Sequence, residues 1–336
     1  MPELKQHELS TLPAHVRRVD GLPATPFKFS ICTLMTRTGE YAEMVESFER
    51  AGFSPADCEY LHIVNAGENQ FDAYTGYNLF LQSARGEHVI LCHQDILLKF
   101  DRRDVLEQRM RELDALDPAW ALLGNAGISR RLGLPVAAIR ISYPTGDGST
   151  GNFPAQVDSL DENFIVVKRE ANLAVSHDLR GFHFYGTDLC QMAKILGRTA
   201  YAVDFHLLHK SQGRLDGGFF RERVEFVKKY NRALRGREVY ATTGQLYLSG
   251  NALASRFFNL SRREILFMHL SVMRRHSAKP TPASVLQKIR ELEEELGAGW
   301  NAFFILRDKI IKPFFKIRRW FGKKLFNRPV VAKQTS

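Results

Sequence analysis

Three polar residues, His93, Gln94 and Asp95, directly follow a short apolar run, VILC, at residues 89–92. A short run of Val, Ile and Leu that is bounded by polar residues predicts a buried strand. In an open α/β sheet, ligands bind beyond the carboxyl ends of the parallel strands. The Asp95 carboxylate is therefore expected to face a crevice, where it could ligate a divalent cation that also binds phosphate oxygens of a substrate. Considered alone, this aspartate could equally be a solvated loop residue.

Strands and helices alternate on both sides of this motif. The predicted strands are 27–35, 59–67, 88–93, 120–128, 162–170 and 199–209, and the predicted helices are 40–53, 73–86, 102–116 and 186–197. About thirty residues per unit is typical of βαβ crossovers in a parallel sheet. The stretch 142–154 is expected to be a loop. Its GDGSTG segment matches a dinucleotide-binding glycine pattern, but it lacks the preceding strand and following helix that such a site requires.

The composition is that of a globular protein. The chain has 336 residues, of which 44% are hydrophobic and 25% are charged. The first 26 residues contain no apolar segment typical of a secretory signal, and no apolar stretch has the ~18 residues of a membrane span. Four cysteines without C-x-x-C spacing indicate reduced thiols in a cytosolic protein rather than a disulfide framework or a cysteine zinc site.

Most of the net charge of +10 lies near the C-terminus. Residues 307–333 contain ten Lys or Arg and one Asp, so the rest of the chain is almost neutral. A neutral body argues against nucleic-acid binding. Wound as a helix, residues 309–325 place Ile and Phe on one side and most Lys and Arg on the other, which predicts a helix that lies on an anionic membrane through residues 306–326. A helix packed on its own domain is the alternative.

Residues 27–215 resemble the family-2-like glycosyltransferases with the GT-A fold. The resemblance rests on segments that occur in the family's order: FSICTL, VNAGEN, YNLFLQSARGEHVILCHQDI, VDSLDENFIVVKRE, FHFYGTDLCQMAKILG and VDFHLLHKSQG. The HQD segment is similar to a variant of the D-x-D metal signature found in one bacterial branch of these enzymes. The resemblance implies a Rossmann-like α/β fold with a mostly parallel sheet, flanked by helices and followed here by a helical C-terminal extension.

The resemblance also implies a donor site. Asp95 and His209 would bind Mn²⁺ or Mg²⁺, and the residues expected to contact the nucleotide are Thr33, Met35, Asn65, His93 and Gln94. His206 and His209 form an H-x-x-H pair, so a zinc site is a rival interpretation. No third ligand at helical spacing supports zinc, and on a strand these two side chains would point to opposite faces.

Asp188 matches the family's catalytic base, which takes the proton of the acceptor hydroxyl in an inverting transfer. Relatives usually have an acidic pair here, whereas this chain has Thr187 and Asp188. Asp188 could instead cap the helix 189–197. Asp161, His183 and Tyr185 are expected to contact donor or acceptor. The alternative for Asp161 is an exposed acid at a strand edge, and the alternative for His183 and Tyr185 is buried aromatic packing.

The sequence therefore predicts an N-terminal extension (1–25), a GT-A domain (26–235), a helical extension (236–305) and a basic amphipathic tail (306–336). The predicted function is metal-dependent, inverting transfer of a hexose from a nucleotide-diphosphate donor, with UDP-sugar as the expected donor. The acceptor would be a glycan or lipid-linked molecule at the cytoplasmic membrane face, as in polysaccharide biosynthesis. A non-catalytic sugar-nucleotide or carbohydrate-binding protein is the alternative. Leu286, Ile289, Leu292 and Leu296 have the spacing of a packed or paired helix, which leaves a homo-oligomer open.

Overall fold

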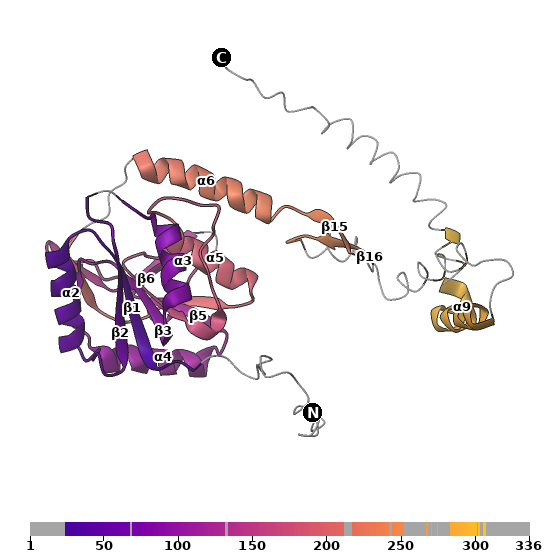
Figure 1. Cartoon of the computed structure of the whole chain (residues 1–336). Coiled ribbons are helices and arrows are strands. Elements are labelled where there is room, and N and C mark those ends of the chain that lie inside the picture. The colour runs from indigo at the N-terminus through magenta and orange to yellow at the C-terminus, as the bar shows by residue number, and fades with distance from the viewer. Residues whose placement is uncertain are drawn as a thin grey trace, which may run out of the picture. The chain divides into compact units, whose positions relative to one another are not determined.

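The computed structural model describes residues 24–67, 69–131, 134–211, 217–241, 244–251, 267, 270, 274, 283–300, 302, 305 and 306. The chain divides into two compact units, Met1–Tyr230 and Asn231–Ser336. Figure 1 shows the strands of the first unit with helices around them. The first unit contains the central sheet and the pocket discussed below.

A seven-stranded sheet forms the centre of the first unit, with the strand order β10-β13-β5-β12-β3-β1-β2. The strands are β1 (Phe27–Met35), β2 (Cys58–Val64), β3 (Gly86–Cys92), β5 (Trp120–Gly124), β10 (Ala155–Gln156), β12 (Phe164–Lys168) and β13 (Thr199–Ala202). Strands β1, β2, β3, β5 and β13 run in one direction, because β3 and β5 are both antiparallel to β12. The predicted α/β fold with a mostly parallel sheet is confirmed.

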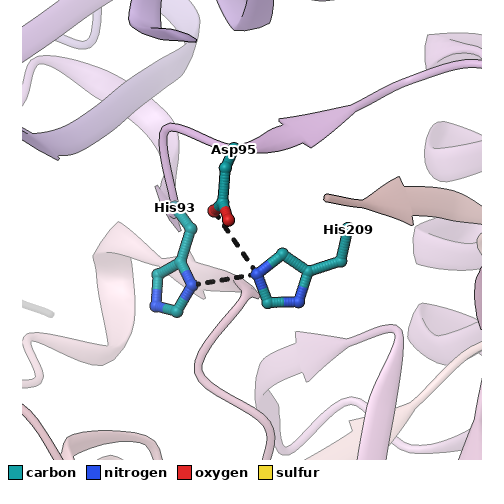
Figure 2. A group of neighbouring side chains, drawn as sticks. All are labelled: His93, Asp95 and His209. Atoms are coloured by element: carbon teal, nitrogen blue, oxygen red, sulfur yellow. Dashed lines mark hydrogen bonds and ion pairs between the residues drawn. The ribbon is translucent and has the colours of Figure 1, made fainter. Parts of the chain in front are cut away.

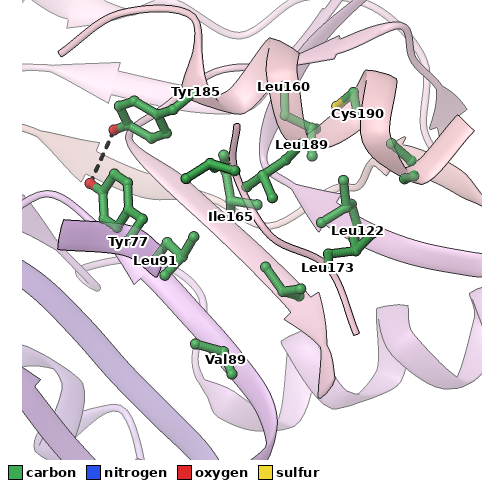
Figure 3. Packing of buried hydrophobic residues seen from close by; sticks show 14 of the residues in the cluster. Tyr77, Val89, Leu91, Leu122, Leu160, Ile165, Leu173, Tyr185, Leu189 and Cys190 are labelled. Atoms are coloured by element: carbon green, nitrogen blue, oxygen red, sulfur yellow. Dashed lines mark hydrogen bonds between the residues drawn. The ribbon is translucent and has the colours of Figure 1, made fainter. Parts of the chain in front are cut away.

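Helices cover both faces of this sheet because alternate strand residues point to opposite sides. Helices α2 (Thr38–Arg50) and α4 (Arg103–Leu116) pack in one apolar cluster with Ile90 and Cys92 of β3. Helices α3 (Ala73–Ser83) and α5 (Tyr185–Ile195) belong to the other cluster, with Val89 and Leu91. Figure 3 shows part of this second cluster. The continuous apolar sequence of β3 follows from this two-sided burial.

Two smaller sheets extend the central one. One has the order β11-β6-β7 and the other β4-β14-β8-β9. Their strands are β4 (Ile96–Leu97), β6 (Ala126–Arg131), β7 (Leu134–Ile139), β8 (Ile141–Tyr143), β9 (Gly146–Asp147), β11 (Ser159–Leu160) and β14 (Leu207–His209). The residues 169–171 form a 3₁₀ turn.

Three predicted elements were wrong in extent. The strand 120–128 is two strands in different sheets, since the buried Asn125 exchanges backbone and side-chain hydrogen bonds with Arg140 and directs the chain away from β5. The strand 199–209 is likewise divided between β13 and β14. The expected loop 142–154 contains β8 and β9. In the first two cases a continuous run in the sequence crosses between sheets, which local periodicity does not register.

The second unit contains a hairpin and a helix. Strands β15 (Arg237–Ala241) and β16 (Gly244–Leu248) pair antiparallel, and α9 (Ala283–Leu296) buries Leu292 and Leu296 against Phe267 and Leu270. The predicted helical extension therefore omitted the hairpin. The predicted tail helix (309–325) lies outside the described residues, as do residues 1–23 of the N-terminal extension. Within the described part of the chain, no helix combines the length and apolar character needed to cross a bilayer.

Candidate metal centre and active-site pocket

A pocket of about 800 Å³ opens at the carboxyl ends of β1, β2 and β3. Its walls come from five parts of the first unit: the strand ends, the β6–β7 region, the turn before β12, the loop before α5 and the residues after β14. The lining residues include Leu34, Thr36, Arg37, Glu40, Asn65, Tyr77, His93, Gln94, Asp95, Ile128, Asp161, Glu162, Phe182, His183, Phe184, Tyr185, His209, Lys210, Ser211 and Phe219. This volume is within the range of small-molecule sites.

Among the described residues, one group of three side chains has the arrangement of a metal site: His93, Asp95 and His209 (Figure 2). Their ligand atoms all lie within 4.8 Å of one another. His209 Nε2 is 3.4 Å from His93 Nδ1 and 3.3 Å from Asp95 Oδ1. The structure thus brings together the two predicted metal ligands and adds His93, which had been assigned to the nucleotide.

Strand pairing places these residues beside one another. His93 and Asp95 lie in the turn between β3 and β4, and β4 pairs antiparallel with β14, so that His209 faces Ile96. The Lys210 N–H donates to the Asp95 carbonyl at 2.9 Å, which continues this register by one residue. The pairing of two short strands therefore brings together His93 and His209, which are 116 residues apart in the sequence.

The donor set fits a divalent transition metal. Two nitrogens 3.4 Å apart can ligate one ion at ~2.1 Å, because their separation is less than twice that distance. Imidazole nitrogens suit Mn²⁺ or Zn²⁺ better than Mg²⁺, which prefers an all-oxygen shell. Burial, with the neighbouring His209, lowers the pKa of His93, so its ring is neutral and able to bind a metal.

The Asp95 carboxylate is held in its charged form. Burial alone would raise its pKa, but hydrogen bonds from His209 and Ser211 lower the pKa below its usual range. Ser211 Oγ donates to Asp95 Oδ2 at 2.5 Å. An ionised carboxylate beside a neutral imidazole is the protonation state that metal binding requires.

A chain of tyrosine hydroxyls orients His93. Tyr77 donates to the Tyr185 oxygen at 3.2 Å, and Tyr185 donates its own proton to the Glu162 carbonyl at 3.0 Å. Because the Tyr185 proton is used in this way, its oxygen accepts from His93 Nε2, 3.0 Å away. We therefore assign the proton of His93 to Nε2, which leaves the Nδ1 lone pair directed at His209 and the candidate metal position. Figure 3 shows the two tyrosines.

Gln94 links the end of β3 to the loop that follows β1. Its Oε1 accepts from the backbone N–H groups of Thr36 and Arg37, at 2.8 and 3.0 Å. Its Nε2 donates to Thr36 Oγ1 and Glu40 Oε2, at 2.7 and 3.3 Å. The amide is therefore fully engaged in holding this loop. Gln94 also lines the pocket, and its contact with a nucleotide stays a prediction.

Two of the predicted nucleotide contacts lie outside the pocket. Thr33 is fully buried, with its hydroxyl 3.3 Å from Cys92 Sγ, and Met35 is also buried; neither lines the pocket. Leu34 and Thr36 line it instead. The prediction identified the correct strand end but the wrong phase of the side-chain alternation, because a shift of one residue turns every side chain to the other face.

Asn65, which is predicted to contact the nucleotide, lines the pocket and also has a local structural role. Its Nδ2 donates to the Phe71 carbonyl at 2.8 Å, and its Oδ1 accepts from the Phe71 N–H at 3.2 Å. The amide thus closes the loop between β2 and α3, and a purely acidic side chain could supply only one of these two bonds.

The prediction that Asp188 is the catalytic base is corrected by its surroundings. Its side chain is completely buried and does not line the pocket. The carboxylate accepts from the Ser176 N–H, the Ser176 hydroxyl and the Tyr230 hydroxyl, each at 2.7 Å. A carboxylate enclosed by these donors cannot reach an acceptor hydroxyl in the pocket. Nor does it cap a helix, since α5 begins earlier, at Tyr185.

The carboxyl groups that do line this side of the pocket are Asp161 and Glu162. Asp161 Oδ1 accepts from the backbone and side chain of Asn163, at 3.0 and 2.5 Å. Glu162 Oε1 accepts from the Gly186 N–H at 3.2 Å. Burial raises the pKa of Glu162 to about 8, and the charge of Asp161 adds to this shift while the Gly186 N–H opposes it. Glu162 is not among the predicted site residues, although the acidic pair in LDENF is visible in the sequence.

Helix α6 (Gly217–Ala233) supports the loop before α5. Glu222 Oε2 accepts from the backbone N–H groups of Phe182 and His183, both at 2.9 Å. The Phe184 ring packs on Phe219 and Phe226 of α6 at centroid distances of 4.9 and 5.6 Å. His183 and Tyr185, both predicted to contact donor or acceptor, line the pocket through this loop; Tyr185 also contacts His93, as described above. The contribution of α6 had no signal in the motif pattern.

His206 is not part of the metal centre. Its Nε2 lies 2.8 Å from Ser142 Oγ, and its ring stacks on Phe100 at a centroid distance of 3.9 Å. The H-x-x-H pair proposed as a zinc site therefore does not form, although His209 has a second imidazole partner in His93.

Comparisons with known proteins give one close sequence relative and several distant structural ones. No protein-family model matches the sequence. A Fuscovulum blasticum protein named "ATP synthase subunits region ORF 6" is 36% identical over 252 residues, which are 74% of this chain and all of that protein. S. aureus TarS 1-349 in complex with UDP-GlcNAc is 13% identical with a TM-score of 0.41, covering 61% of this chain and 67% of that one.

Two further solved structures show similarity of the same order. The mannosyltransferase PcManGT from Pyrobaculum calidifontis, in complex with GDP-Man and Mn²⁺, is 14% identical with a TM-score of 0.40, covering 93% of this chain and 91% of that one. A197 from STIV is 11% identical with a TM-score of 0.33, and the match covers 56% of this chain and 98% of that one. Similarity of this extent assigns neither a substrate nor a reaction.

Proposed function

The chain belongs to the family of the Fuscovulum blasticum ORF 6 protein, and we propose that it is a metal-dependent glycosyltransferase of the GT-A type. It would move a sugar from a nucleoside-diphosphate donor, with a UDP-sugar as the first donor to test, to the hydroxyl of a glycan or lipid-linked acceptor. The proposal combines the resemblance of the motifs in residues 27–215 with the α/β fold and the composition of the pocket.

One observation carries the proposal: His93, Asp95 and His209 converge inside a pocket at the carboxyl edge of a mostly parallel sheet. Three protein ligands leave coordination positions for oxygens of a substrate. A bound divalent cation would supply positive charge to a diphosphate leaving group. We propose Mn²⁺ as the ion, because the two imidazoles disfavour Mg²⁺ and the remaining coordination positions would take diphosphate oxygens, which Mn²⁺ accepts.

Other residues of the pocket would bind the nucleotide, bind the acceptor and accept its proton. The loop at Thr36 and Arg37, held by Gln94, would contact the nucleotide, and the opposite wall would hold the acceptor. For an inverting transfer, a carboxylate must take the proton of the acceptor hydroxyl as its oxygen bonds to the anomeric carbon and the bond to the diphosphate breaks. We propose Glu162 for this role, since it lines the pocket and its raised pKa makes it a stronger base than an ordinary carboxylate.

The proposal is tested by measuring nucleotide binding with and without metal. Binding of UDP, GDP and their sugar derivatives should require Mn²⁺, with Mg²⁺ and Zn²⁺ as comparison ions. Asp95→Ala should lower the metal-dependent affinity for nucleotide at least ~10-fold, because one of three ligands is lost. Asp104→Ala, which removes an exposed carboxylate on α4, is the matched control and should bind normally. Unchanged metal-dependent binding by folded Asp95→Ala protein would exclude this centre.

A further inference from the structure

The outer face of α6 carries an apolar stripe that no other described element covers. Phe220, Val224 and Val227 are 59%, 47% and 44% exposed. Their spacing of four and three residues places them in one row along the helix. Single exposed apolar residues are normal on a protein surface, but an aligned row of large ones marks a contact surface. We call these three residues the α6 apolar stripe.

The inner face of the same helix is already occupied. Phe226 and Tyr230 pack on each other at a centroid distance of 4.7 Å, and the Tyr230 hydroxyl binds Asp188. Glu222 holds the backbone of the loop before α5. The part of α6 up to Tyr230 is therefore fixed to the first unit by its inner face, and the α6 apolar stripe is not needed for that packing.

Basic residues flank the stripe on both sides. At 100° per residue, Arg221 lies on one side of it and Arg223 on the other. Both are exposed, and neither forms an ion pair with a carboxylate in the part of the chain that the structure describes. Helix α6 as a whole has five Lys or Arg and two Glu. An apolar row between cations is complementary to a surface with apolar depth and negative headgroups.

The stripe begins next to the pocket. Phe219 lines the pocket, and its ring meets that of Phe220 edge-on at 5.4 Å. Phe182, which also lines the pocket, is 40% exposed on the loop that Glu222 holds. The pocket opening and the amino-terminal end of the stripe are therefore adjacent parts of one surface.

From these observations we infer that α6 lies on an anionic membrane through Phe220, Val224 and Val227, with Arg221 and Arg223 against lipid headgroups. This places the pocket opening at the lipid surface, where it would receive an acceptor whose apolar anchor stays in the bilayer. The inference rests on the proposed function for the identity of that acceptor and extends it to a lipid-linked substrate. It assigns membrane contact to the first unit, in addition to any contact made by the C-terminal tail.

A fluorescent reporter on α6 tests this contact independently of the tail. Full-length Phe220→Trp protein is mixed with phosphatidylcholine–phosphatidylglycerol vesicles whose acyl chains are brominated, and the wild-type signal is subtracted to remove the natural tryptophans. We expect quenching of the added fluorescence and a blue shift. Leu116→Trp, at the end of α4 on the opposite face of the sheet, is the matched control and should show neither. Absence of quenching for Phe220→Trp would overturn the inference in favour of a protein partner for the stripe.

A second arm measures affinity. The double variant Phe220→Asp, Val224→Asp should lose about tenfold or more in vesicle affinity, since two apolar groups no longer enter the interface. Arg221→Glu with Arg223→Glu should lose affinity for phosphatidylglycerol vesicles selectively. Mn²⁺-dependent nucleotide binding should be unchanged in both, which also shows that they fold. Wild-type vesicle affinity in both double variants would overturn the inference while leaving the proposed function in place. Quenching of Phe220→Trp in a protein that binds no nucleotide would support the membrane contact and contradict the proposed function.

Discussion

At the scale of single residues, the candidate metal centre is positioned by a hydroxyl that is not itself among the three possible ligands. Tyr185 accepts the Nε2 proton of His93 and so directs Nδ1 towards His209. Tyr185→Phe should therefore lower Mn²⁺ affinity about tenfold, as expected for the loss of a hydrogen bond that orients a ligand. Electron paramagnetic resonance of free Mn²⁺ measures this directly.

Tyr201→Phe is the control for that substitution, because the Tyr201 hydroxyl binds Asp117, away from the pocket. It should bind Mn²⁺ as the wild type does. Equal Mn²⁺ affinity in Tyr185→Phe and Tyr201→Phe would show that the tyrosine does not orient His93.

A second prediction at this scale concerns Glu162. Its carboxyl must be ionised to accept a proton, and its pKa is raised to about 8, so kcat/KM should increase with pH until about 8 and then level off. Glu162→Gln should reduce the rate by about 10²–10⁴-fold while keeping donor affinity. The exposed Glu170→Gln serves as the control and should retain the wild-type rate and profile. A wild-type rate that is flat across this pH range would remove Glu162 from the role of base.

At the scale of elements, α5, α6 and the loop between η1 (Arg169–Ala171) and α5 meet at the buried Asp188. Asp188→Asn should destabilise the fold by about 1–3 kcal/mol, because an amide cannot accept from all three donors. Once corrected for the folded fraction, its turnover should stay close to that of the wild type. Urea denaturation and turnover by folded protein are the measurements.

Asp178→Asn provides a matched comparison, since Asp178 pairs with Lys229 of α6 at the surface. Asp178→Asn should lower the free energy of unfolding by less than ~1 kcal/mol, as for most exposed ion pairs. If Asp188→Asn keeps its stability and loses turnover by orders of magnitude, Asp188 is the base after all and the pocket must rearrange to reach it.

At the scale of the whole molecule, the charge distribution separates a nearly neutral body from a basic C-terminal segment. Deleting residues 307–336 should leave metal-dependent nucleotide binding intact, because every proposed site residue lies in the first unit. Affinity for anionic vesicles should fall without disappearing, since the α6 contact remains. Co-sedimentation with vesicles at low and high salt measures this, and salt should weaken the full-length protein more.

The triple variant Lys312→Glu, Lys316→Glu, Arg319→Glu separates charge from chain length. It should reproduce most of the loss seen on deletion while nucleotide binding stays unchanged. Loss of nucleotide binding on deletion would mean that residues 307–336 contribute to the folded first unit, which would contradict the tail prediction.

The sequence alone determined the features that depend on local order. The short apolar run of β3, the helical periods of α2 to α5 and the polar residues His93 to Asp95 that follow β3 could all be recognised, because they reflect neighbours within a few residues. The same holds for the basic C-terminal segment, whose charge is a property of composition. These features were enough to predict the fold class and the strand end where the site lies.

Tertiary structure decided which side chains share a space. Strand pairing between β4 and β14 brought His209 to Asp95, and the facing helices determined that Leu34 rather than Thr33 meets the pocket. Burial decided that Asp188 lies outside the pocket and that Glu162 has a raised pKa. Each outcome depends on contacts between residues far apart in the chain, which set the face, the enclosure and the electrostatic environment of a side chain. Local periodicity contains none of that information.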